Sequence, residues 1–222
     1  MLELAVLLLF SFFAIRATFK TDEGIDEIPD KIGIRLGRLW DIAHQGMKEN
    51  KLLRAEKALL TILKIDEKNA AAYNRLGILY AKQKEFKDAI DCFEIASSIE
   101  KSASSLHNLG LIYYETGDYQ RASIAFEEAL QLDSNMAARH IAYAKVEEKL
   151  GNDKKMISEL EKAAELEPNK ETYSLLLRAY EIKGMQDEAA LLQRKLGKLL
   201  TSGAKASATR PKRVQRPPRV VV

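Results

Sequence analysis

The sequence predicts an all-α protein: a solenoid of about five helix-turn-helix repeats, preceded by an apolar segment and followed by a basic tail. Three observations predict this. A pattern of seven positions recurs 33 residues further along the chain, with the same residue at six of them and Tyr73 replaced by Leu106 at the seventh. Of the 222 residues, 46% are hydrophobic and only 7% aromatic, a balance typical of helical globular proteins. The single cysteine excludes an internal disulfide and a CxxC-type metal site.

The first expected element is a transmembrane anchor over residues 1–19. Its apolar run extends from Leu4 to Ile15 and is bounded by Glu3 and Arg16. About eighteen helical residues of the whole segment rise roughly 27 Å, close to the hydrocarbon thickness of a bilayer. The acid at Glu3 and the lack of a small-x-small pair after the run favour an uncleaved anchor. An atypical signal peptide and a buried helix remain the alternatives.

The flanks of this segment predict its orientation. Arg16 and Lys20 follow the apolar run and no Lys or Arg precedes it, so the repeats are expected on the cytoplasmic side of a single-pass membrane protein. Residues 20–35 are expected to form a linker and the lead-in to the first helix. The acidic stretch from Thr21 to Asp30 is the linker itself.

The repeats are expected over residues 36–200. Their five units cover residues 36–69, 70–102, 103–136, 137–169 and 170–200. The second unit carries Tyr73, Leu76, Gly77, Tyr80, Ala89, Phe93 and Ala96, and the third repeats them as Leu106, Leu109, Gly110, Tyr113, Ala122, Phe126 and Ala129. This spacing resembles the tetratricopeptide repeat, a helix-turn-helix unit of about 34 residues. The resemblance implies a protein-binding scaffold rather than an enzyme.

The residue types of the repeat have physical reasons. Gly77 and Gly110 are expected where the two helices of a unit cross closely, and Phe93 and Phe126 are expected to fill the gap between units. A further set of glycines falls between the two helices of a unit, where a residue that tolerates positive φ is favoured. These are Gly117, Gly151 and Gly184.

No catalytic constellation is visible in the sequence. The phosphate-binding, dinucleotide-binding and zinc-protease motifs are absent, and the three histidines belong to three different repeats. His140 falls at a packing position, which favours a satisfied core histidine over a catalytic one. Cys92 is expected to be a buried free thiol. We therefore predict neither an enzyme nor a bound metal or cofactor.

A peptide-binding groove is expected on the first helices of the repeats, where side chains point away from the packing between units. Amide and guanidinium groups there can bind the backbone or a carboxylate of an extended peptide. A solvated polar face is the alternative. The candidate residues are Asn74, Arg75, Lys82, His107, Asn108, Leu111, Tyr114, Arg139 and Lys145.

Two family resemblances narrow this expectation. Co-chaperones of the tetratricopeptide class grip the C-terminus of heat-shock proteins with a Lys and an Asn one turn apart, where this chain has Trp40 and His44, so that role is disfavoured. The N-terminus resembles that of lipopolysaccharide assembly protein B, a membrane-anchored cytoplasmic repeat protein. That family ends in a four-cysteine rubredoxin domain, which Cys92 alone cannot build. The resemblance therefore implies only architecture and topology.

The last segment, residues 201–222, is expected to be a disordered, Pro-rich tail. Its cations could bind anionic lipid, bind nucleic acid or a ribosome, or act only as a solubilising end. They are Lys205, Arg210, Lys212, Arg213, Arg216 and Arg219. The preceding helix carries Leu192, Leu196, Leu199 and Leu200 with no repeat after it, which predicts self-association or a partner helix there.

Overall fold

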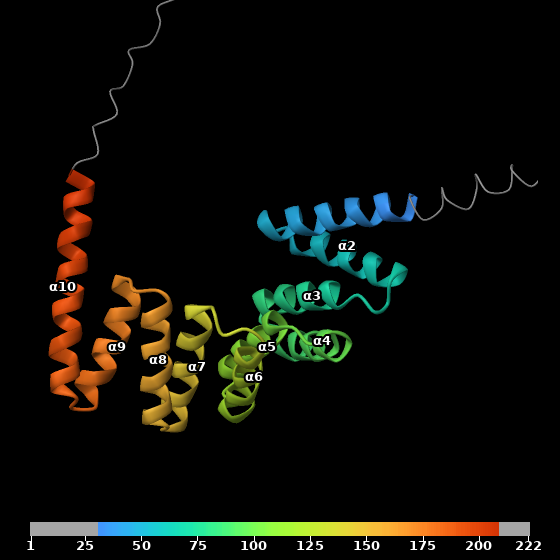
Figure 1. Cartoon of the computed structure of the whole chain (residues 1–222). Coiled ribbons are helices and arrows are strands. Elements are labelled where there is room, and N and C mark those ends of the chain that lie inside the picture. Colours follow the sequence, from blue (N-terminus) through green and yellow to red (C-terminus); the bar gives the residue numbers. More distant parts are fainter. Residues whose placement is uncertain (1–30, 209–222) are drawn as a thin grey trace, which may run out of the picture. The chain divides into compact units, whose positions relative to one another are not determined.

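The computed structural model describes residues 31–208, and every regular element in that range is an α-helix (Figure 1). A first helix covers residues 31–48. The helices that follow are α2 (Leu52–Ile65), α3 (Ala70–Gln83), α4 (Phe86–Ile99), α5 (Ala103–Glu115), α6 (Tyr119–Leu132), α7 (Ala137–Leu150), α8 (Asp153–Leu166), α9 (Lys170–Ile182) and α10 (Gln186–Ala208). The all-α prediction is confirmed for this part of the chain.

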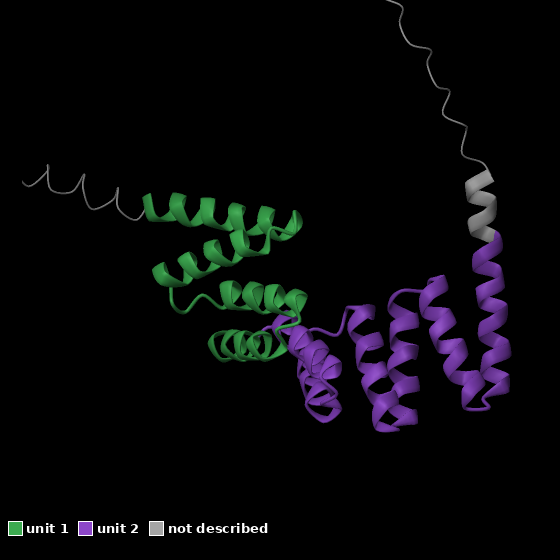
Figure 2. Ribbon diagram, turned by 180° about the vertical axis from the view of Figure 1, so that it is seen from behind, with its two compact units in different colours: residues 1–101 green, residues 102–222 purple. Residues whose placement is uncertain are grey.

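The described helices form consecutive pairs. We call the first helix of each pair the A helix and the second the B helix, so the A helices are residues 31–48, α3, α5, α7 and α9. The pairs fall into two compact units, with the boundary after Lys101 (Figure 2). Within each unit, the B helix of one pair packs against the A helix of the next: α2 against α3 in unit 1, and α6 against α7 and α8 against α9 in unit 2.

The close helix crossing predicted for Gly77 and Gly110 is confirmed. A Cβ atom added to Gly77 would lie 2.7 Å from Cε1 of Phe93, and one added to Gly110 would lie 2.9 Å from Cε2 of Phe126. Both rings are almost fully buried. A hydrogen is therefore the only side chain that fits between the A and B helices at these positions.

The turn inside each repeat uses a left-handed residue. Gly151 ends α7 with φ 75°, as the sequence predicts. Lys84 fills the same place after α3 with φ 65°, so the second repeat makes the same turn without a glycine. Its backbone N–H donates to the carbonyl groups of Tyr80 and Ala81, which closes the end of the helix.

Each unit has its own apolar core. In unit 1 the core includes Leu59, Ile62, Leu76 and Leu79, with Cys92 at its edge. Burial raises the pKa of the Cys92 thiol to about 11, so it is protonated at neutral pH, as expected of a buried free cysteine.

The core of unit 2 includes Met156, Leu160, Leu176, Tyr180 and Leu192. Leu192 is only 6% exposed, so the prediction that it lies uncovered is wrong. Its own repeat buries it, because α10 packs along α9. Leu200 remains 47% exposed, as expected.

His140 is a satisfied core histidine, as predicted. The residue is 3% exposed, its Nδ1 lies 2.6 Å from Oε2 of Glu159, and its Nε2 lies 2.9 Å from the carbonyl oxygen of Ser134. Lys162 donates to the other Glu159 oxygen at 2.9 Å. Both ring nitrogens and both carboxylate oxygens therefore have partners.

Several predicted features fall outside the described residues: the anchor over residues 1–19, the linker up to residue 30, and the tail cations from Arg210 onward. Helix α10 continues to Ala208, past residue 200 where the sequence places the start of the tail, so Lys205 lies in a helix. Alanines 204, 206 and 208 favour this continuation. Within residues 31–208, no helix combines the length and apolar composition that crossing a bilayer requires.

Candidate functional site

The A helices of unit 2 present a surface that the packing of the repeats leaves open. Their remaining faces are covered by the B helices, and α5 lies beside α7. We call this surface the A-helix wall. It mixes apolar and charged side chains that are exposed or half-buried: Asn108, Leu111, Ile141, Lys145, Glu148, Leu175, Arg178 and Ile182. Ile182 is 61% exposed, unusual for so large an apolar side chain.

A cavity of about 250 Å³ opens in this wall between α7 and α9, and we call it the α7–α9 groove. Its floor contains the buried side chains of Met156 and Leu160 from α8. Its rim comes from the two A helices: Ile141, Lys145 and Glu148 from α7, and Leu175, Arg178 and Ile182 from α9. The groove is therefore apolar at its base and charged at its edge.

The two cations of the rim are available to a ligand. Lys145 and Arg178 are both exposed, they project from different helices, and neither forms an ion pair among the described residues. Lys183, at the end of the groove, differs because its Nζ lies 2.7 Å from Oδ1 of Asp153. Two unpaired cations above an apolar floor can bind a carboxylate whose neighbouring apolar side chains enter the groove.

Unit 1 carries three of the sequence-predicted site residues, all on α3. The guanidinium of Arg75 lies 5.4 Å from the ring centre of Trp40, a cation–π contact between two A helices. Asn74 is half-buried and interacts with other residues of the protein. Lys82 is exposed near the end of the helix. The guanidinium of Arg75 is thus already in contact with Trp40, and Lys82 is the most accessible of the three residues.

Helix α5 carries four more predicted site residues. The His107 ring lies edge-on to Phe126, with 5.4 Å between centroids, and its Nδ1 is buried without a hydrogen-bond partner. Tyr114 packs against Tyr119 at 5.6 Å, and Asn108 is half-buried. Leu111 is 38% exposed and is the one that faces outward most openly.

Arg139 departs from the prediction. It was expected on the open wall, but its side chain is 2% exposed. Its Nη1 lies 3.1 Å from Oδ2 of Asp133 and also donates to the carbonyl oxygen of Asp133. The guanidinium folds back onto the loop before α7 and so cannot contact a ligand in the groove. Lys145, two turns further along α7, lies on the groove rim.

The buried ring of His107 predicts a dependence of stability on pH. Burial, and secondly the charge of Arg139, lowers the pKa of His107 below its ordinary value of 6.5. The unfolded chain therefore binds a proton at His107 more readily than the folded chain does. The contribution of this side chain to the free energy of unfolding is complete above pH 6.5 and is lost as the pH falls toward the lower pKa of the folded state. Urea midpoints at about pH 7.5 and 5.5 measure this loss.

His107→Gln should reduce the difference between the two midpoints. His44→Gln, at an exposed position on the first helix, is the matched control and should leave it unchanged. An unchanged difference in His107→Gln would contradict the assignment to His107.

Five residues of the groove rim were missed by the sequence prediction: Ile141, Glu148, Leu175, Arg178 and Ile182. The sequence contains a pattern that could have predicted the three residues on α9. Leu175, Arg178 and Ile182 lie three and four residues apart, which places them on one face of a helix. The predicted groove took residues only from the second to the fourth repeats, so the fifth repeat contributed none.

The fold and groove define a class: a helical repeat protein that exposes the A helices of its repeats. Two family models, both described as the tetratricopeptide repeat, match residues 68–135 and 138–170, so tetratricopeptide repeats are found in that part of the chain. A comparison with the sequences of curated proteins found no match.

Solved structures with a similar fold include MamA and the tetratricopeptide protein YrrB. The crystal structure of MamA is 24% identical, covers 82% of this chain and 100% of that chain, and has a TM-score of 0.67. MamA from Desulfovibrio magneticus RS-1 is 15% identical, with coverage of 76% and 96% and a TM-score of 0.67. YrrB is 20% identical, with coverage of 71% and 82% and a TM-score of 0.60.

Nothing in the described residues indicates catalysis. Between residues 31 and 208, no group of three or more His, Cys, Asp or Glu side chains could hold a metal ion. The Cys92 thiol is buried and protonated, and His140 is held on both nitrogens.

Proposed function

We propose that this protein is a scaffold that binds a partner protein through an extended segment or helix laid on the A-helix wall of unit 2. The observation that carries the proposal is the α7–α9 groove, with unpaired Lys145 and Arg178 above an apolar floor. The structure of YrrB is described as that of a repeat protein with an unusual peptide-binding site, which supports peptide binding as a use of this fold.

The groove favours a particular kind of segment. Ile141, Leu175 and Ile182 offer apolar contacts along its edge, and the two cations offer charge-assisted hydrogen bonds. A segment with an acidic side chain between apolar ones satisfies both. Of the residues predicted from the sequence, Leu111 and Lys145 remain part of this proposal, while Arg139 does not.

The proposal includes attachment to a membrane through residues 1–19, which places the repeats on its cytoplasmic surface. This part rests on the sequence: the apolar run from Leu4 to Ile15 and the cations that follow it. A scaffold held there recruits its partner to the membrane.

The test is co-purification of the full tagged chain after fractionation and detergent extraction of membranes. In Lys145→Glu combined with Arg178→Glu, recovery of bound partners should fall by at least about tenfold, because the rim then repels a carboxylate. The matched control, Lys154→Glu with Arg194→Glu, makes the same charge change on exposed positions of α8 and α10 outside the groove.

Equal recovery of bound partners from the two variants would show that the α7–α9 groove is not the binding site. The same experiment examines the anchor, because a chain found in the aqueous fraction before detergent is added would contradict a membrane role for residues 1–19.

A further inference from the structure

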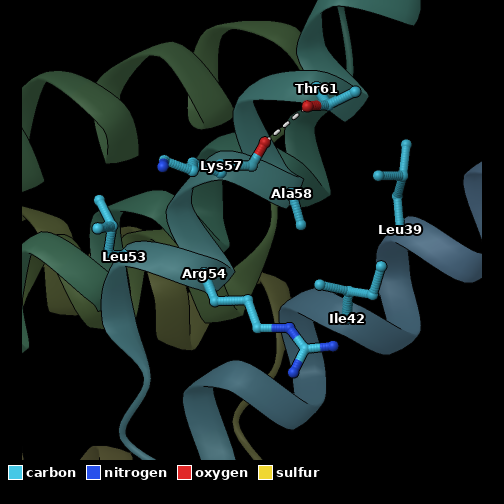
Figure 3. A pocket seen from close by; sticks show the side chains of 7 residues that line it. All are labelled: Leu39, Ile42, Leu53, Arg54, Lys57, Ala58 and Thr61. Atoms are coloured by element: carbon cyan, nitrogen blue, oxygen red, sulfur yellow. Dashed lines mark hydrogen bonds between the residues drawn. The ribbon is translucent and has the colours of Figure 1, made fainter.

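Unit 1 carries an apolar groove of about 440 Å³ between the first helix and α2 (Figure 3). In the close view, Leu39 and Ile42 of the first helix lie across the groove from Ala58 of α2. Leu53 lines it as well and is 64% exposed, the highest value of any leucine in the described residues. We call this the first-repeat groove.

Comparison with the next repeat shows why the groove is open. Ile42 corresponds to Leu76, which lies 34 positions further along the chain. Leu76 is 2% exposed, because α2 packs against α3 and joins it in one core. Ile42 stays half-buried, since no described helix precedes its own. The same repeat position is therefore covered in the second repeat and uncovered in the first.

Cations surround this groove. Arg54 and Lys57 line it, with Arg54 extending toward the helix that carries Ile42 and Lys57 extending away from that helix (Figure 3). Arg35 and Arg38 precede Leu39 and Ile42 by four residues each, so they share their helix face. All four cations are exposed. The groove thus selects an occupant that is both apolar and acidic.

The chain itself supplies such a segment next to the groove. Residues 20–30 immediately precede the first described helix and contain Ile25 and Ile28 among five acids: Asp22, Glu23, Asp26, Glu27 and Asp30. Leu39 lies only about 12 Å along the helix from its start, whereas eleven extended residues span up to about 36 Å. Such a short tether gives the segment a local concentration on the order of millimolar, well above that of a separate molecule.

We propose that residues 20–30 of the same chain dock on the first-repeat groove. Ile25 and Ile28 bind its apolar surface, and the carboxylates of the segment pair with Arg54 and the other cations at its edge. The segment then covers the first repeat as α2 covers the second. This inference is independent of the partner-binding proposal, because it concerns a different groove and an occupant within the chain.

Hydrogen exchange of the backbone amides of residues 20–30 tests the docking in the detergent-solubilised full chain. We expect slowed exchange in the native chain and at least about tenfold faster exchange in Arg54→Glu with Lys57→Glu. Adding Asp26→Lys and Glu27→Lys to that variant restores the charge match and should restore much of the protection. The matched control, Lys64→Glu with Lys68→Glu, changes exposed cations outside the groove and should leave exchange slow.

Other outcomes overturn the proposal. Unprotected amides in the native chain mean that the segment does not dock. Protection that survives the charge reversal at Arg54 and Lys57 comes from the detergent micelle or another surface. If the protection of residues 20–30 disappears on dilution, the segment docks on a second copy of the chain and not on its own groove.

Discussion

Replacing Phe126 with alanine should lower the free energy of unfolding by about 3–5 kcal/mol. The ring is fully buried, lies over Gly110, and packs against His107 and Tyr143 at centroid distances of 5.4 and 6.3 Å. Neighbouring helices cannot collapse far into the space it leaves, because both are fixed by their own repeats. Urea unfolding followed by circular dichroism measures the loss.

Ile124→Ala on the same helix is the matched control. Ile124 is 58% exposed, so its truncation should change stability by no more than about 0.5 kcal/mol. The same ring also makes Gly110→Ala destabilising in the native chain. In the Phe126→Ala background that substitution should become neutral or stabilising, since alanine favours helix over glycine. Similar losses for Phe126→Ala and Ile124→Ala would show that the ring does not hold these helices together.

Replacing Glu159 with leucine should cost about 3 kcal/mol. Glu159 is 4% exposed and its Oε2 lies 2.6 Å from Nδ1 of His140. The substitution leaves that nitrogen buried without a hydrogen-bond partner. The free energy lost when the nitrogen is removed from water is then no longer offset by a hydrogen bond in the folded protein. The same urea titration measures the effect.

The double variant His140→Leu with Glu159→Leu should be more stable than Glu159→Leu alone, because no unpaired ring nitrogen is left behind. We expect the two substitutions to deviate from additivity by at least about 1 kcal/mol. Simple additivity of the two single effects would mean that the pair is not coupled. Lys162→Leu, which removes the exposed partner of Glu159, should cost far less.

The repeats were predictable from the sequence because their key contacts lie inside a single repeat. Gly77 and Phe93 touch across a single helix pair, and the same contact recurs in Gly110 and Phe126. A contact between residues this near in sequence leaves a fixed spacing that can be read directly. His140 was predictable for the same reason, since its position in the repeat faces the core.

The candidate site was less predictable because it depends on loops and on neighbouring repeats. Arg139 lies on a helix face that could have been open, but the turn at Asp133 brings a carboxylate and a carbonyl within its reach. Helical periodicity contains no information about that turn. The α7–α9 groove needs side chains from two A helices and a floor from α8, a combination that no single motif specifies.

The packing of each helix mainly against its chain neighbours has a consequence for local unfolding. Helix α7 is held between α6 and α8, whereas α10 packs chiefly against α9. Opening of α10 therefore breaks one interface and costs less than opening α7, so fraying begins at that end of unit 2. A ligand in the α7–α9 groove would hold α9 in place, and through it α10. Occupancy of the groove and order at the last helix are thus coupled, and a bound partner would protect a part of the chain that it does not touch.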